Sequence, residues 1–195
     1  MKYNDVIETQ IVTDVASFND EPVTLAEIKR HLNLQFDTSG SYVFTDDDTK
    51  LQEIAKSSRE VIEQYIGVSM ASKTLKAIIR NECGNIEIPF GPVTTLTSIK
   101  DADGVALTSG TTYIVRGNQF RWIESPRACY LEVNYTAGYT KLTIPAGLKR
   151  ALFEQIAFDY ANAGDQQREY ATANVSICES ALAKAFPYSR KSLVA

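Results

Sequence analysis

The sequence contains a single histidine, His31, which any Ser-His-Asp or Cys-His mechanism would have to use as its base. It lies among Lys29, Arg30 and Leu32, and no Gly-x-Ser-x-Gly nucleophile turn occurs anywhere in the chain. A histidine near a helix C-terminus is stabilised by the negative end of the helix dipole, which accounts for it without catalysis. We therefore expect no enzymatic activity and no cofactor.

Three consecutive acids, Asp46, Asp47 and Asp48, have the residue type of a magnesium or nuclease cluster. Consecutive helical residues point about 100 degrees apart, so three in a row do not converge on one ion. They fit better at a helix N-terminus, where negative charge is favourable. The segment Asp101–Gly104 resembles half of a calcium loop but lacks the later ligands, so we expect a hairpin turn there.

The three cysteines, Cys83, Cys129 and Cys178, are far apart in the sequence and odd in number. This spacing fits neither a zinc site nor a disulfide framework, so small buried thiols in a reducing compartment are expected. No glycine-rich phosphate loop is present either. Chemistry based on a metal, a thiolate or a bound phosphate is therefore not predicted.

Several aromatic residues fall on runs that resemble strands and could in principle stack on nucleic-acid bases. They are Tyr113, Phe120, Trp122, Tyr130 and Tyr135. Basic residues are sparse among them, namely Arg116, Arg121 and Arg127. We therefore interpret these aromatic side chains as sheet core and subunit contact.

The charge is distributed unevenly along the chain. The formal net charge is −4, but residues 1–66 alone contain 13 acidic and 6 basic residues. An acidic third repels phosphate, which argues against tight DNA reading but not against a surface that DNA slides past. No apolar run approaches the roughly 20 residues of a membrane span, and the polar N-terminus does not resemble a signal peptide. A soluble protein made in the cytoplasm, with no membrane partner, is expected.

Two helices are predicted in the first third of the chain. The first covers residues 24–32, because Thr24 and Glu27 have the spacing of a reciprocal capping box. The second covers residues 46–66, with an apolar stripe at helical spacing. Gly67 stands where a helix-ending glycine is expected.

The next stretch, residues 74–139, consists of short β-rich runs broken by turn residues. A third helix is predicted at residues 145–163, opening at Pro145, where a missing amide costs nothing. A short fourth helix is expected within residues 175–185. Strands segregated from helices predict an α+β fold, mainly an α-helical bundle with a small inserted antiparallel β-sheet.

Three parts of the chain are expected. Residues 1–20 are interpreted as a loosely held N-terminal lead-in, and residues 21–163 as the main domain, with a β-rich insertion at 74–139. Residues 164–195 are interpreted as a hinge followed by a C-terminal docking segment.

The order of several short motifs resembles the head–tail connector (adaptor) family of tailed bacteriophages. The motifs are Glu21–Leu32, the helix end Tyr65-Ile66-Gly67 after Asp47-Asp48, Ile86–Val93, the hairpin Asp101–Gly104, and Val133–Tyr139 followed by Ile144-Pro145. Each motif alone is weak, but the ordered set covers about residues 21–160. The resemblance implies a connector domain that acts as a structural virion protein.

The resemblance further implies a location in the virion neck, at the head–tail interface, after synthesis in the host bacterial cytoplasm. Copies of the chain would form a ring, of about 12 subunits in this family, beneath the portal protein. The ring would extend the DNA channel and seat the next neck or tail-completion protein. DNA would pass through the ejection channel without being bound.

Two surfaces are predicted to serve this role. The acids Asp46, Asp47 and Asp48 are candidates for the channel wall, because like charge keeps DNA from adhering. The candidate portal-docking residues are Phe186, Pro187, Tyr188, Arg190, Lys191 and Leu193. The same C-terminal segment could instead pack on its own domain.

Two other classes of protein remain open from the sequence. One is a different neck protein, such as a stopper or tail-completion subunit, which would bind the adaptor instead of the portal. The other is a nucleic-acid-binding module built on the aromatic strands, which the acidic balance disfavours.

Overall fold

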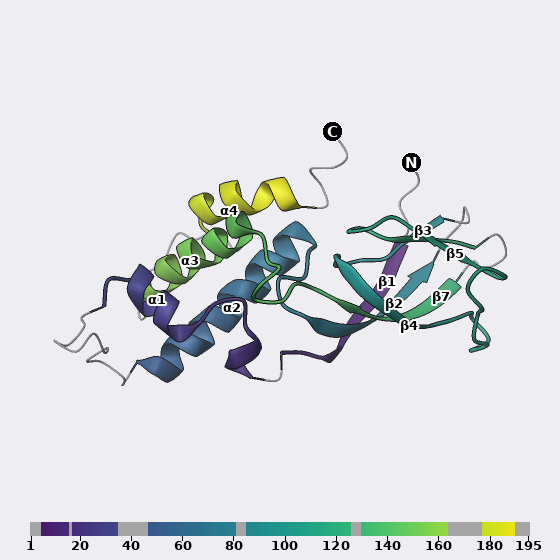
Figure 1. Cartoon of the computed structure of the whole chain (residues 1–195), viewed down its shortest axis with the longest axis horizontal. Coiled ribbons are helices and arrows are strands. Elements are labelled where there is room, and N and C mark those ends of the chain that lie inside the picture. The colour runs from purple at the N-terminus through teal and green to yellow at the C-terminus, as the bar shows by residue number, and fades with distance from the viewer. Residues whose placement is uncertain are drawn as a thin grey trace. The chain divides into compact units, whose positions relative to one another are not determined.

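The computed structural model describes residues 5–15, 17–34, 47–80, 85–125, 130–163 and 177–189. The chain divides into two compact units. One holds residues 1–16 and 67–140 and contains the strands, whereas the other holds residues 17–66 and 141–195 and contains the helices (Figure 1). Segregated helices and antiparallel strands confirm the α+β class.

The helical unit has four α-helices and two short 3-10 helices among its described residues. They are η1 (Phe18–Asp20), α1 (Leu25–His31), α2 (Asp48–Ile66), α3 (Ala146–Ala161), α4 (Glu179–Ala185) and η2 (Phe186–Tyr188). The predicted helices at 24–32, 46–66 and 145–163 are therefore confirmed to within a few residues at each end.

Local capping chemistry sets the helix ends as expected. The Glu27 amide donates to Thr24 Oγ1 at 3.3 Å, and the Thr24 amide donates to Glu27 Oε2 at 2.9 Å, which completes the capping box. After α2, Gly67 has a φ of 68°, the left-handed conformation that glycine adopts without steric cost.

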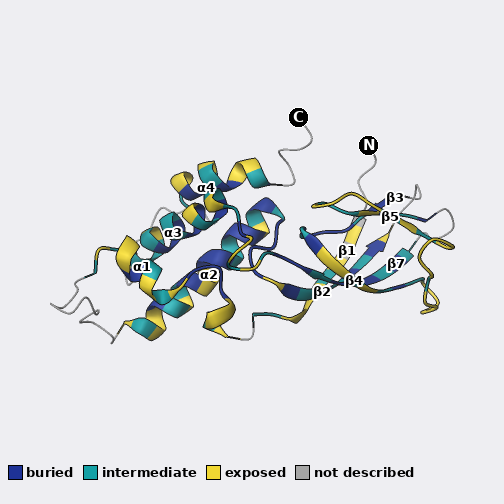
Figure 2. Ribbon diagram, viewed as in Figure 1, coloured by how far each residue is buried: buried dark blue, intermediate teal, exposed yellow. Residues whose placement is uncertain are grey.

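The core of the helical unit lies between α2 and α3, with α1 and α4 packed on them (Figure 2). Its fully buried side chains recur three or four residues apart along each helix, as one face of a helix requires. They include Ile28, Leu51, Ala55, Ile62, Ile66, Leu148, Ala151, Leu152, Ile156, Ala181 and Ala185.

The strand unit contains two antiparallel sheets. The strands are β1 (Asp5–Thr13), β2 (Lys73–Arg80), β3 (Asn85–Glu87), β4 (Val93–Lys100), β5 (Ile114–Arg116), β6 (Trp122–Glu124) and β7 (Tyr130–Ala137). Four strands form one sheet in the order β1-β2-β7-β4, and three form a second in the order β3-β6-β5. The inserted β part is thus two sheets with their own core, larger than the single small sheet that the sequence predicts.

The two sheets enclose one hydrophobic cluster. Along β2 and β7 buried residues alternate with more exposed ones, as expected for strands with one covered face. The cluster consists of Leu75, Ala77, Ile79, Ile86, Ile88, Val93, Ile99, Ile123, Leu131, Val133, Tyr135 and Ala137. Tyr135 is fully buried, and its hydroxyl donates to the Pro89 carbonyl at 2.7 Å. This aromatic side chain is core, as predicted.

The N-terminal segment differs from the sequence expectation. Residues 5–13 form β1, which pairs antiparallel with β2, so this stretch is part of a sheet and not a loosely held lead-in. The segment that β1 joins is more than 60 residues away in the sequence, since Ile11 lies opposite Leu75. Periodicity within residues 1–20 carries no information about so distant a partner.

The predicted hairpin turn after β4 is present. The Asp101 carboxylate accepts the amides of Asp103 and Val105 at 3.1 and 2.8 Å, and the Asp101 amide donates to the Val105 carbonyl at 3.0 Å. The expected return strand at 105–107 is reduced to a single bridge between Ala106 and Lys100. Asp101 thus uses its carboxylate to close the turn.

Candidate docking and channel surfaces

The acids at the start of α2 are partly engaged inside the helical unit. The Asp48 carboxylate pairs with the ammonium of Lys29, a side chain only 4% exposed. Asp47 is exposed, and its Oδ2 accepts from the Tyr160 hydroxyl of α3 at 3.1 Å. Asp46 lies outside the described residues. Of the two described acids, Asp47 is therefore the one with surface available for a second role.

The surroundings of Asp47 also affect Tyr160. Burial raises the pKa of the Tyr160 phenol, and the hydrogen bond to Asp47 and its negative charge raise it further. The ammonium of Lys50 lies 5.6 Å from the centre of the same ring. The neutral phenol thus connects the N-terminus of α2 to α3 by a hydrogen bond that persists at neutral pH.

The C-terminal docking candidates are held on the helical unit as far as the structure describes them. Tyr188 packs against the first turn of α3, since a Cβ atom at Gly147 would lie 2.6 Å from its hydroxyl. Ser189 is buried, whereas Phe186 is 49% exposed and Pro187 is exposed. Residues Arg190, Lys191 and Leu193 lie outside the described residues. Part of the segment packs on its own unit, and Phe186 and Pro187 face outward.

A buried ionic cluster links the segment before α1 to α2. Arg59 is fully buried, its Nε donates to Glu21 Oε2 at 2.9 Å, and its Nη1 donates to Glu63 Oε2 at 2.8 Å. Both carboxylate side chains are nearly fully buried. Sequence reasoning missed this cluster because charged residues at helical spacing are ordinarily placed on the solvent face.

A second ion pair joins α1 to α3. Lys149 Nζ lies 2.7 Å from Glu27 Oε1, so the carboxylate that closes the capping box also contacts a cation. Burial alone would raise the pKa of Glu27, but the hydrogen bonds from Lys149 and Thr24 outweigh it and lower that pKa. The capping carboxylate therefore remains charged at neutral pH.

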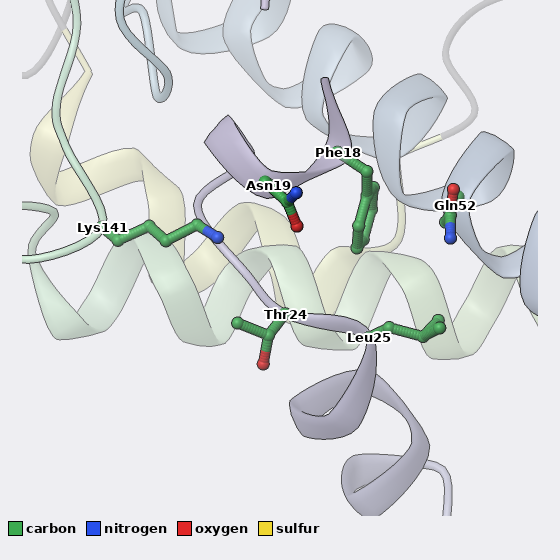
Figure 3. Close-up of a pocket in the computed structure, with 6 residues that line it drawn as sticks. All are labelled: Phe18, Asn19, Thr24, Leu25, Gln52 and Lys141. Carbon is green, nitrogen blue, oxygen red and sulfur yellow. The ribbon is translucent and has the colours of Figure 1, made fainter.

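The helical unit also has a pocket of about 320 Å³. It is lined by Phe18, Asn19, Thr24, Leu25, Gln52 and Lys141 (Figure 3). These six residues include one cation, two amides and two apolar side chains, while the Thr24 hydroxyl already accepts from the Glu27 amide. This combination suits contact with another side chain and contains no carboxylate, imidazole or thiol for acid–base or nucleophilic chemistry.

Exposed apolar side chains are the feature that sequence reasoning mostly missed. Those of large size are Val6, Ile11, Val12, Val105, Ile114, Trp122, Leu142, Phe158 and Phe186. Leu142 is 96% exposed, in the turn before α3. Exposed side chains of this kind, where they gather, mark surfaces that contact another protein.

His31 and Cys178, which were weighed for catalysis, both contact other residues of the helical unit. His31 is the last residue of α1 and stacks on Phe153, with ring centroids 5.2 Å apart. Cys178 is a free thiol whose Sγ accepts from the Ala181 amide at the start of α4. Cys83 and Cys129 lie outside the described residues. Among the residues the structure describes, no three His, Cys, Asp or Glu side chains gather in a metal-binding group.

None of the described helices is both long and apolar enough to cross a membrane. No sequence model of a known protein family matches the chain, and no curated protein matches it in sequence.

Solved structures share its fold across almost the whole chain. A chain from the neck of an empty gene transfer agent particle, computed with C6 symmetry, aligns with a TM-score of 0.70 at 20% identity, covering 94% of this chain and 95% of that one. A chain from the native gene transfer agent virion aligns with a TM-score of 0.69 at 19% identity and the same coverage. A chain from the native particle's neck, computed with C12 symmetry, gives 0.63 at 18% identity, again with the same coverage. The chain thus shares its fold with chains from the neck and virion of gene transfer agent particles.

Proposed function

We propose that the chain is a structural subunit of the neck of a tailed phage or phage-like particle. The observation that carries this proposal is the match of both units at once, since the likeness covers 94% of this chain and 95% of a neck chain. The ordered connector motifs between residues 21 and 160 support the same assignment from the sequence.

Within the neck, we propose the role of head–tail connector, or adaptor. Copies of the chain form a ring under the portal protein, extend the DNA channel, and seat the next neck or tail-completion protein. This role requires complementary surfaces and no reacting groups. Exposed apolar residues on both units, such as Trp122 and Leu142, support it by supplying contact area.

The test is to mix the purified full chain with the portal protein of the same particle and to image the product, with light scattering on the free chain. A ring stacked on the portal supports the adaptor role and gives the copy number. A chain that ignores the portal but binds an assembled adaptor ring is a stopper or tail-completion subunit instead. Salt-dependent binding to DNA fragments would favour a nucleic-acid-binding module.

We propose that Phe186 and Pro187 contact the portal, together with Arg190, Lys191 and Leu193 beyond the described residues. Replacing Phe186 with serine should weaken portal binding about tenfold or more, because a half-exposed aromatic anchor would lose its partner pocket. The midpoint temperature of thermal unfolding should change little, because Phe186 is 49% exposed in the free chain. The dissociation constant of each variant is measured on portal rings immobilised on a sensor surface.

A matched control is Phe158→Ser, which removes a 38% exposed phenylalanine from α3 of the same unit. It should leave portal binding unchanged. Deleting residues 186–195 is a poorer test, because it also removes Tyr188 from Gly147 and the buried Ser189. Portal binding by Phe186→Ser at the wild-type level would contradict the docking proposal.

We also propose that Asp47 lines the channel. Particles that carry Asp47→Lys should eject DNA several-fold more slowly, because the change adds attraction to phosphate in every subunit of the ring. Asp48 is unsuitable for this test, since its reversal would leave the buried Lys29 facing a second cation. Ejection is followed by the fluorescence of a DNA-binding dye.

Glu53→Lys is the control for Asp47→Lys. Glu53 is an exposed acid of α2, about 240 degrees further round the helix axis from Asp47. A channel role for Asp47 predicts slow ejection only for the Asp47 variant. Normal ejection by that variant would refute the assignment of Asp47 to the channel wall.

A further inference from the structure

In the part of the chain that the structure describes, the apolar side chains on the core side of β1 are about half exposed. Strand pairing places Val6, Thr9 and Ile11 opposite Ile79, Ala77 and Leu75 of β2, and these three partners are buried in the core cluster. Directly opposed residues point to the same face of a sheet, so the β1 residues continue the core face. Val6 is nevertheless 41% exposed and Ile11 48% exposed.

The exposure of Val6 and Ile11 follows from which strands of the first sheet share the core with the second sheet. Its strands β3 and β6 contribute Ile86 and Ile123 to the cluster, which also takes residues from β2, β7 and β4, whereas none of the described side chains of β1 belongs to it. Among the described strands, β1 also pairs on one side only. An edge strand of nine residues with half-exposed apolar side chains is a ready site for another protein surface.

A different apolar patch lies on the outer face of the small sheet. Ile123 of β6 is fully buried, so its neighbour Trp122 points to the opposite face and is 39% exposed. Ile114 of β5 lies opposite Glu124 on that outer face and is 47% exposed. The ion pair of Arg116 with Glu124, at 2.8 Å, borders the two apolar side chains.

We propose that these two patches contact each other between neighbouring copies of the chain. The β1 stripe, defined as Val6, Thr9 and Ile11, packs on the outer patch, defined as Ile114, Trp122 and Arg116, of the next copy. This inference rests on the proposed ring, and it deepens that proposal by naming the surfaces that close it.

A second copy is the occupant that best fits both patches. A ring is built from head-to-tail contacts, which require two different complementary surfaces on every subunit. The strand unit carries two such surfaces, one on each sheet. The chains that share its fold come from particle necks computed with C6 and C12 symmetry. The outer patch contains a tryptophan, an isoleucine and an arginine, and the arginine forms an ion pair with Glu124. Tryptophan and arginine are enriched at the centres of protein interfaces.

The test uses two variants of the full chain, Ile11→Lys in the β1 stripe and Trp122→Glu in the outer patch. Each alone should raise the concentration needed for ring formation about tenfold or more. Mixed in equal amounts, they should form a dimer that cannot grow, because one intact stripe meets one intact patch. Mass photometry and imaging on portal rings measure both effects.

The control is Glu8→Lys, whose exposed residue lies opposite Ile78 on the other face of β1, and it should assemble like the wild type. Val6→Lys, at a 41% exposed position of the same stripe, replaces Ile11→Lys if that variant does not fold. Benzoylphenylalanine placed at position 6, in the stripe, should crosslink to the peptide containing residues 114–122 of a neighbouring copy.

The outcomes separate this contact from the proposed function. Wild-type rings with crosslinks to the helical unit, or normal assembly of both variants, would overturn the contact and leave the neck role standing. A wild-type chain that forms no ring, alone or on the portal, would overturn the proposed ring and the contact with it. Capped dimers in the mixture, with crosslinks to residues 114–122, support both.

Discussion

Replacing Arg59 with methionine is expected to lower the free energy of unfolding by about 3–5 kcal/mol. The substitution keeps an apolar stem of similar length but removes the guanidinium that contacts Glu21 at 2.9 Å and Glu63 at 2.8 Å. Two nearly buried carboxylates would then lack their shared cation, which costs far more than the loss of a surface pair. Urea unfolding followed by circular dichroism at the helix band measures the change.

Glu60→Gln is the matched control for Arg59→Met. Glu60 lies beside Arg59 on α2, but its nearest contact with the guanidinium is 3.9 Å and its side chain is 42% exposed. Its replacement should alter stability by about 0.5 kcal/mol or less. Equal effects of the two variants would contradict the account based on buried charge.

The cluster as a whole is expected to be replaceable. A triple variant with Arg59→Met, Glu21→Leu and Glu63→Leu removes all three charges together, so no charged member is left without its partner. Buried ion clusters exchanged for apolar residues of similar volume are often neutral or stabilising. The triple variant should therefore recover most of the stability that Arg59→Met loses. Recovery would show that the three charges together contribute little net stability.

The same cluster shows where sequence reasoning stops. Helix ends follow from local chemistry, so Thr24 with Glu27 and the glycine at position 67 predict them directly. The interior face of α2 is predicted only where it is apolar. Arg59 and Glu63 are buried because Glu21, 38 residues away from Arg59, supplies a second carboxylate. Nothing in the local pattern of α2 indicates that partner.

In the strand unit too, the local sequence predicts individual strands but not how distant strands pair. Short β-rich runs between turn residues indicate β2 and β7, and the Asp-Gly turn that begins at Asp101 indicates the hairpin. The pairing of β1 with β2 depends on which distant strand has a free edge, which residues 5–13 do not encode locally. The candidate docking surfaces share this difficulty. The exposure of Trp122 and Phe186 is set by the packing of other segments, although both residues are visible in the sequence.

Gly138→Ala is expected to destabilise the strand unit by about 3–5 kcal/mol. Gly138 follows β7 with a φ of 115°, a backbone conformation that side chains with a Cβ rarely adopt. A Cβ atom there would lie 1.9 Å from the Ala71 carbonyl oxygen and 2.4 Å from its carbon. Those atoms are backbone just before β2, so no side-chain rotation relieves the collision. This collision explains why position 138 of the motif Val133–Tyr139 is a glycine.

Trp122 is the only tryptophan of the sequence and lies in the same unit, so its fluorescence during urea unfolding reports the change. Gly104→Ala is the control, because Gly104 has a φ of 78° but a Cβ atom there would meet nothing within 4 Å. That control should cost only about 1–2 kcal/mol, the expense of the left-handed conformation alone. The difference between the two variants isolates the collision with Ala71. If they were equally destabilised, backbone strain alone would explain Gly138, and the close approach of the Ala71 carbonyl to the end of β7 would make no contribution to stability.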